Sequence, residues 1–148
     1  MEIPERVYAR AIGNADRDAN GCLVSRYSMG GHGYAQIGWN EGGKTIVTTV
    51  HRAVWIHENG ELPAGYTVDH TCKNKRCAEL SHLRSLKNFE NGRRINGADW
   101  PLGQCKNGHD NKHLRLVNGG RKLACWPCKQ DWNRRYYLKR RKARAVET

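Results

Sequence analysis

Residues 69–91 read DHTCKNKRCAELSHLRSLKNFEN, and this stretch decides how the chain is interpreted. It mixes two sets of side chains with different chemistry. The soft ligands, which suit zinc, are Cys72, Cys77 and His82. The harder groups, which suit a magnesium-like ion or proton transfer, are Asp69, His70 and Asn91. A structural metal site beside a catalytic one is therefore the first expectation.

The composition points to a small, metal-supported protein. The chain has 148 residues, 38% of them hydrophobic and only one Phe, so the core must be small and needs extra support. The start at 1–5, MEIPE, is not a signal peptide, and no apolar run approaches the ~20 residues of a membrane span. We therefore expect a cytoplasmic protein, not secreted, whose six cysteines are reduced thiols. A disulfide framework, the alternative, suits a secreted domain better.

The charge of the chain indicates a polyanionic partner. The formal net charge is +12, which favours nucleic acid first and an anionic membrane second. Half of that charge lies in residues 129–148, which hold eight Lys or Arg and two acidic residues. The run from Arg134 to Arg144 suits phosphate contacts, and a solvated, partly disordered tail is the alternative.

Local patterns predict an α+β fold with a small antiparallel sheet. We expect helices at 4–13, 51–59, 85–94 (with Ser85 as N-cap) and 129–145. We expect strands at 23–27, 34–39, 44–50 and 66–70, and no regular element at 14–21 or 71–82. The predicted domains are 1–94, a linker at 95–104, and a zinc-binding module with a basic C-terminal helix at 105–148.

Two groups of Cys and His predict two structural zinc sites. The second group offers four ligands in two close pairs, with a loop at 110–124 between them: Cys105, His109, Cys125 and Cys128. His113 is the alternative ligand in this second group. A redox pair, the other interpretation of Cys125 and Cys128, needs a thioredoxin-like context that this sequence does not have.

The first group, Cys72, Cys77 and His82, is one ligand short. Closure by Cys22 would use every thiol of the chain in two four-ligand sites, and His32 is the alternative fourth donor. A three-ligand catalytic zinc with an open position for water is the competing interpretation.

The central segment resembles the HNH, or ββα-metal, endonucleases of the His-Cys box type, which include phage-encoded and homing enzymes. The resemblance rests on the spacing of five residues at offsets 0, 2, 7, 12 and 21: His70, Cys72, Cys77, His82 and Asn91. The pair His51-Arg52 and the approach Gly-Tyr-Thr-Val-Asp-His also resemble the phage pattern, so the similarity covers about 51–94. Relatives commonly have Asn-Pro before the second His, where this chain has Ala-Glu-Leu at 78–80.

The resemblance implies a one-metal DNA endonuclease. His70 would be the general base, and Asn91, with Asp69, would hold a catalytic Mg²⁺ or Mn²⁺. The positions of the first Cys/His group would bind structural zinc, completed by a distant upstream cysteine. The implied partner is double-stranded DNA, and the sequence leaves open a monomer or a homodimer. If the protein is phage-encoded, it would act in the host-cell cytoplasm.

Basic residues complete the predicted site. Arg52 is a candidate clamp on the phosphate, and a solvated helix charge is the alternative. The other candidates for DNA binding are Arg93, Arg94, Arg134, Arg135, Lys139, Arg140, Arg141 and Lys142. The competing function is a non-catalytic, zinc-stapled nucleic-acid-binding protein in which His70 and Asn91 are structural. A nuclease that cleaves RNA is a third and weaker hypothesis.

Overall fold

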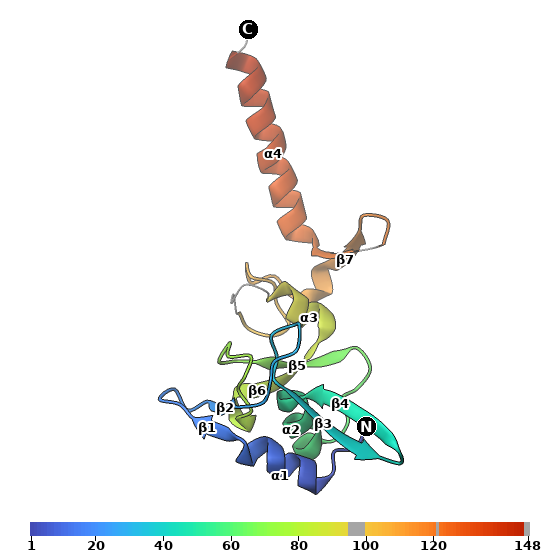
Figure 1. The fold of residues 1–148 in the computed structure, drawn as a ribbon. Helices are drawn as coiled ribbons and strands as arrows, with labels where there is room; N and C mark the ends of the chain where they lie inside the picture. The colour runs from blue at the N-terminus through green and yellow to red at the C-terminus, as the bar shows by residue number, and fades with distance from the viewer. Residues whose placement is uncertain (95–99, 121, 147–148) are drawn as a thin grey trace. The chain divides into compact units, whose positions relative to one another are not determined.

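The computed structural model describes residues 1–94, 100–120 and 122–146 of the chain. Contacts within the chain divide it into two compact units, Met1–Arg93 and Arg94–Thr148 (Figure 1). Positions 95–99 of the predicted linker lie outside the described residues.

The α+β class predicted from the sequence is confirmed, because short antiparallel strand pairs alternate with helices. In the first unit the strands form three separate antiparallel pairs, β1 with β2, β3 with β4 and β5 with β6. These strands are β1 (Ala15–Arg17), β2 (Leu23–Ser25), β3 (Gln36–Glu41), β4 (Lys44–Thr49), β5 (Tyr66–His70) and β6 (Leu83–Lys87). The helices of this unit are α1 (Glu5–Gly13), α2 (Val50–Asn59) and α3 (Asn88–Arg93). The first two agree with the sequence to within one residue, and Gly60 ends α2 with a positive φ of 81°.

The core of the first unit lies between α1, α2 and β3. Val7 and Ala11, one helical turn apart, are fully buried on α1 and face the buried stripe of α2. Alternate residues of β3, Ile37 and Trp39, point inward from the sheet. The buried apolar set is small, as the composition suggests, and is Ile3, Val7, Ala11, Ala35, Ile37, Trp39, Val50, Ala53, Val54, Ile56, Leu62, Val68, Ala78 and Leu83.

A strand–strand–helix unit carries the segment that the sequence singled out. β5 and β6 pair antiparallel, with Asp69 opposite Arg84 and His70 opposite Leu83, and α3 follows at once. The helix predicted at 85–94 is present as α3, but it begins only at Asn88, and the prediction of Ser85 as its N-cap is wrong because Ser85 lies in β6 opposite Val68. Pairing with β5 satisfies this backbone and buries the leucines of β6, and that tertiary gain overrides the local capping preference.

Strand β1 was not expected from the sequence, which reads as a polar turn at 14–21. Its three residues are partly or fully exposed, so no hydrophobic alternation marks them. The pairing is held instead by the backbone ladder to β2 and by an ion pair between Asp16 and Arg26. Such a strand has no signal that the sequence alone could supply.

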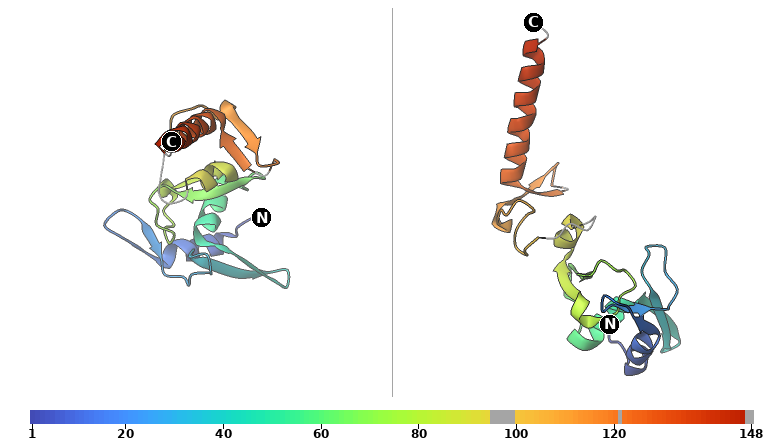
Figure 2. Two further views of the ribbon diagram at one scale, coloured as in Figure 1. Left: turned by 90° about the horizontal axis from the view of Figure 1, so that it is seen from above. Right: turned by 90° about the vertical axis from the view of Figure 1, so that its left-hand side faces the viewer.

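The second unit consists of a hairpin and a long helix. Strands β7 (Leu114–Val117) and β8 (Lys122–Cys125) pair antiparallel, and α4 (Trp126–Val146) begins directly after β8. Figure 2 shows α4 running on from this hairpin. The helix begins three residues earlier than 129, so Cys128 lies in its first turn.

Candidate active site and metal centres

A cleft of about 240 Å³ opens along β5 in the first unit. Its walls come from β5, α2 and α3 and from the segments before β3 and α2. The residues that line it are Tyr34, Thr49, His51, Arg52, Thr67, Val68, Asp69 and Asn91. The fold thus brings three of the four predicted catalytic residues, Arg52, Asp69 and Asn91, to one cleft.

Asp69 is held by its cross-strand neighbour Arg84. The Nε and Nη2 atoms of Arg84 both lie 2.9 Å from the Oδ2 atom of Asp69. Because both contacts end on the same oxygen, they fix the carboxylate while Oδ1 keeps its lone pairs for another partner. The side chain is therefore oriented at the edge of the cleft before any ligand binds.

His70 is buried beside the cleft rather than in its lining. The residue is 5% exposed, and the Nε2 of its ring lies 3.0 Å from the carbonyl oxygen of Cys77. A carbonyl only accepts, so Nε2 carries the hydrogen and Nδ1 keeps the lone pair of a neutral imidazole. Burial lowers the pKa of His70, which the bond to the Cys77 carbonyl partly offsets. The ring is thus neutral at pH 7 and in a fixed tautomer.

The sequence did not predict His51 as a site residue, although the pair His51-Arg52 was part of the resemblance to the phage pattern. His51 is 7% exposed and lines the cleft. The centroid of its ring lies 4.5 Å from that of the His70 ring and 5.0 Å from that of the Tyr34 ring. Its Nδ1 atom is buried, and the described residues give it no hydrogen-bond partner. Burial, helped by His70 and Arg52, lowers the pKa of His51 to about 3. The sequence signal that could have pointed to His51 is a histidine among the apolar residues of α2.

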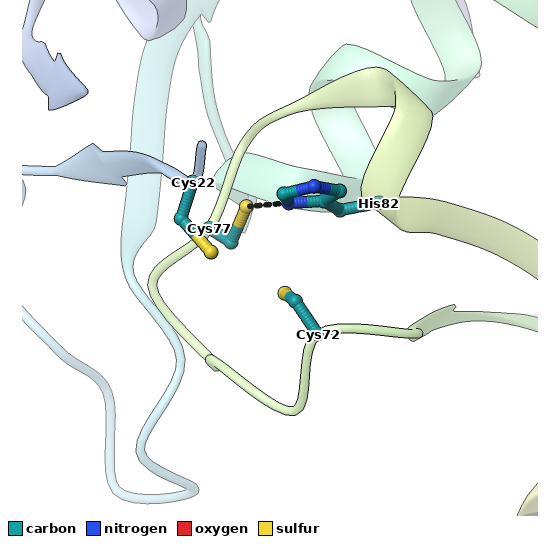
Figure 3. A group of neighbouring side chains, drawn as sticks. All are labelled: Cys22, Cys72, Cys77 and His82. Atoms are coloured by element: carbon teal, nitrogen blue, oxygen red, sulfur yellow. Dashed lines mark hydrogen bonds between the residues drawn. The ribbon is translucent and has the colours of Figure 1, made fainter. Parts of the chain in front are cut away.

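The first Cys/His cluster closes with Cys22 (Figure 3). One ligand atom from each of Cys22, Cys72, Cys77 and His82 lies within 4.8 Å of all the others. The Sγ of Cys77 is 3.6 Å from the Nδ1 of His82, and a tetrahedral zinc would hold such a pair about 3.6 Å apart. The cysteines are free thiols, and the geometry fits an ion and not a disulfide. His32, the alternative donor, is not part of the cluster.

Backbone contacts explain how Cys22 reaches a loop fifty residues away in the chain. β2 makes an isolated bridge between Val24 and Cys77, and the N–H of Ala78 donates to the oxygen of Leu23 at 2.7 Å. The Arg76 side chain adds a bond of 2.9 Å from its Nε to the Ser25 oxygen. The residue before β2 is therefore carried to the loop between β5 and β6.

The second cluster lies in the second unit at the start of α4. Its members are Cys105, His109, Cys125 and Cys128, again with ligand atoms within 4.8 Å of one another. The Nδ1 of His109 lies 3.5 Å from the Sγ of Cys105, 3.6 Å from that of Cys125 and 3.3 Å from that of Cys128. These spacings also match a tetrahedral zinc. His113 lies outside the cluster, in a short 3₁₀ turn (Asn111–His113).

The candidate DNA-binding residues divide into exposed and buried ones. The six on α4 are exposed: Arg134, Arg135, Lys139, Arg140, Arg141 and Lys142. Arg94 is 5% exposed, and its Nη2 donates to the carbonyl oxygen of Trp100 at 3.0 Å while the guanidinium covers the Trp100 ring. These contacts give Arg94 a structural role, so of the pair Arg93 and Arg94 only Arg93 remains a candidate phosphate contact.

None of the helices among the described residues is both long and apolar enough to cross a membrane.

Three similarities to known proteins were found. The HNH endonuclease family matches residues 48–93. The uncharacterized gene 5.3 protein of Enterobacteria phage T3 is 31% identical over 65 residues, which are 44% of this chain and 64% of that protein. A structure titled "DNA binding and cleavage by the HNH homing endonuclease I-HmuI" matches with a TM-score of 0.41 and 29% identity, over 56% of this chain and 49% of that one. The chain thus spans 64% of the length of the phage protein and 49% of that of the homing endonuclease.

Proposed function

We propose that the chain is a metal-dependent endonuclease that hydrolyses phosphodiester bonds in double-stranded DNA, because residues 48–93 match the HNH endonuclease family. The observation that carries the proposal is the cleft along β5, where Asp69, Asn91 and Arg52 meet beside the buried ring of His70. These are an acid, an amide and a guanidinium around one space, next to an imidazole. A site for a phosphate and a divalent ion needs these groups.

Asp69 and Asn91 are the residues that would hold a catalytic Mg²⁺ or Mn²⁺. Both offer oxygen donors, both line the cleft, and the Oδ1 of Asp69 receives neither of its two contacts from Arg84. The donor set fits a hard ion that keeps most of its waters. When bound, such an ion stabilises the charge that develops on the phosphate and on the leaving oxygen.

His70 is the general base in this proposal. With hydrogen on Nε2, its Nδ1 accepts a proton from the water that attacks the phosphorus. Burial keeps the ring neutral, so the lone pair is available at pH 7. Arg52 contributes a positive charge to the same cleft and binds a phosphate oxygen.

The first Cys/His cluster supports the base as well as the fold. Cys77 offers its thiol to the cluster and its carbonyl oxygen to His70. A zinc ion on these four ligands would fix the loop at Cys77 and, through that carbonyl, the plane of the imidazole. The basic side chains of α4 and Arg93 supply sequence-independent contacts to the DNA backbone.

Cleavage of supercoiled plasmid in Mg²⁺ or Mn²⁺ tests the proposal. We expect His70→Ala to lower the rate by a factor of about 100 or more, the usual contribution of a general base. Asn91→Ala should also lower it, and this loss should be partly recovered at higher metal concentration because a metal ligand has been removed. The matched control is His32→Ala, which removes an exposed imidazole outside the cleft and should cut normally.

Three results would contradict the proposal. Plasmid left intact by the wild type, with DNA still shifted in gels, would favour the non-catalytic zinc-stapled binding protein. Equal cutting by the wild type and His70→Ala would show that the imidazole is not the base. Faster cleavage of a matched RNA would identify a different substrate.

A further inference from the structure

The C-terminal helix α4 carries a row of exposed aromatic rings among its arginines. We define the aromatic–arginine face as Trp132, Tyr136, Tyr137, Arg140, Arg141 and Arg144. Trp132 is 61% exposed and Tyr137 is 63% exposed. From Gln130 to Arg144 nearly every side chain of the helix is exposed, so these rings do not serve the core of the second unit.

The rings of this face stack on one another, and a guanidinium group lies over one of them. The Trp132 and Tyr136 rings stack with centroids 5.3 Å apart and planes 12° apart. The guanidinium of Arg140 lies over the Tyr136 ring, 5.7 Å from its centroid. Tyr137, Arg140, Arg141 and Arg144 surround a hollow of about 260 Å³ beside this stack. One side of the helix thus offers flat π-surfaces next to positive charges.

The charge of α4 decides the class of partner. The helix contains eight Lys or Arg and one acidic residue, Asp131, which pairs with Arg135. A second copy of the chain would bring the same positive charge and be repelled. A polyanion with flat rings satisfies both features at once, because its phosphates pair with the arginines and its bases stack on the aromatics.

We propose that the aromatic–arginine face of α4 binds nucleic acid with unpaired bases, by stacking bases on Trp132, Tyr136 and Tyr137. In a duplex the faces of the bases are covered by their neighbours, so rings of this kind have no equivalent surface to contact. The proposal goes beyond the nuclease function, which requires of α4 only contacts to backbone phosphates. The nuclease function does not depend on it.

The test compares three ligands on the full chain. The ligands are a labelled single-stranded oligothymidylate, an abasic strand of the same length, and a duplex. The protein carries His70→Ala so that no ligand is cut, and binding is followed by fluorescence anisotropy. The variant is Trp132→Leu/Tyr136→Leu/Tyr137→Leu, which keeps apolar side chains on a good helix former but removes the π-surfaces. Leu138→Ala, an exposed apolar change on the same helix, is the control.

We expect the triple variant to bind oligothymidylate at least about tenfold more weakly than its parent, because one or more bases would no longer stack on an aromatic ring. Binding of the abasic strand should be unchanged, because phosphate contacts remain. The slope of log K against log salt should also stay the same, since no charge has been removed. Circular dichroism should show the same helix content for parent and variants.

Two outcomes would overturn the proposal. An equal loss on thymidylate and abasic strands would mean that the rings only shape the helix. A mass in light scattering that rises with concentration for the parent, and not for the triple variant, with unchanged DNA affinity, would assign the face to self-association. Both readouts are independent of cleavage, so they leave the nuclease function untouched.

Discussion

At the scale of single residues, Cys77 joins the two kinds of chemistry in the first unit. Its thiol belongs to the Cys/His cluster, and its carbonyl oxygen accepts the hydrogen of His70 Nε2 at 3.0 Å. Fixing that carbonyl fixes the tautomer of His70, and a base must present its lone pair and not its hydrogen. A metal that never touches the substrate would therefore control which nitrogen can accept a proton.

The buried ring of His51 predicts a loss of stability in acid. Its pKa is about 3 in the folded chain, against 6.5 ordinarily, because burial disfavours the charged form. Between these values the unfolded chain binds a proton that the folded chain excludes, so the free energy of unfolding falls as the pH falls. Lowering the pH from 7 to 5 should therefore reduce the free energy of unfolding of the wild type by about 2 kcal/mol more than that of His51→Phe.

Urea unfolding of both proteins at the two pH values measures this difference. His32→Ala is the control, because an exposed ring meets nearly the same solvent in the folded and unfolded chains. An identical pH dependence for the wild type and His51→Phe would show that the ring is accessible to protons in the folded state. At neutral pH, His51→Phe should be at least as stable as the wild type, because the change removes a buried nitrogen for which the described residues offer no hydrogen-bond partner.

The sequence could identify the chemistry of the site but not its packing. Asp69, His70 and Asn91 stood out because of their residue types and spacing, and these are properties of the chain itself. His51 did not, because its role depends on contacts with Tyr34 and His70, which lie far from it in the chain. The burial of Arg94 was also beyond sequence reasoning, since a charged side chain is ordinarily exposed.

At the scale of elements, predictions succeeded where one local signal was strong. The strand at 66–70 and the helix ended by Gly60 were expected almost to the residue, because β-branched residues and a glycine with positive φ mark them. The helix expected from Ser85 begins only at Asn88, because pairing with β5 makes residues 85–87 part of β6. That pairing is also what sets Asp69 opposite Arg84, so the error concerned the element that orients the site.

The pairing of Cys22 with a distant loop predicts a specific cost for its removal. Cys22→Ser should lower bound zinc from two ions per chain to one, measured by mass spectrometry under native conditions. The free energy of unfolding should fall by more than about 2 kcal/mol, well beyond the effect of an ordinary surface change. The reason is that the loop between β5 and β6 would lose the ligand that ties it to the residue before β2.

Asn20→Ala is the matched control, because it alters an exposed side chain in the same turn. It should keep both zinc ions and the stability of the wild type. Retention of two zinc ions by Cys22→Ser, with unchanged unfolding, would contradict the assignment of Cys22 as a ligand.

At the scale of the whole molecule, metal ligands replace a large core. The apolar core is confined to α1, α2 and the strands near them, and each unit has its own Cys/His cluster. Small domains with little buried apolar surface need such support. In the second unit the cluster includes the first turn of α4, which would hold one end of a helix too exposed to be stable alone.

In the proposed function the first unit holds a divalent ion and a phosphate between Asp69 and Asn91, with His70 beside them. Diffraction at the manganese absorption edge, from crystals of the full chain with bound DNA and Mn²⁺, would locate this ion and its ligands. The predicted result is an anomalous peak bonded to oxygen atoms of Asp69, Asn91 and one DNA phosphate, with Nδ1 of His70 turned toward that phosphate. DNA seated elsewhere on the chain, with no manganese between Asp69 and Asn91, would contradict it.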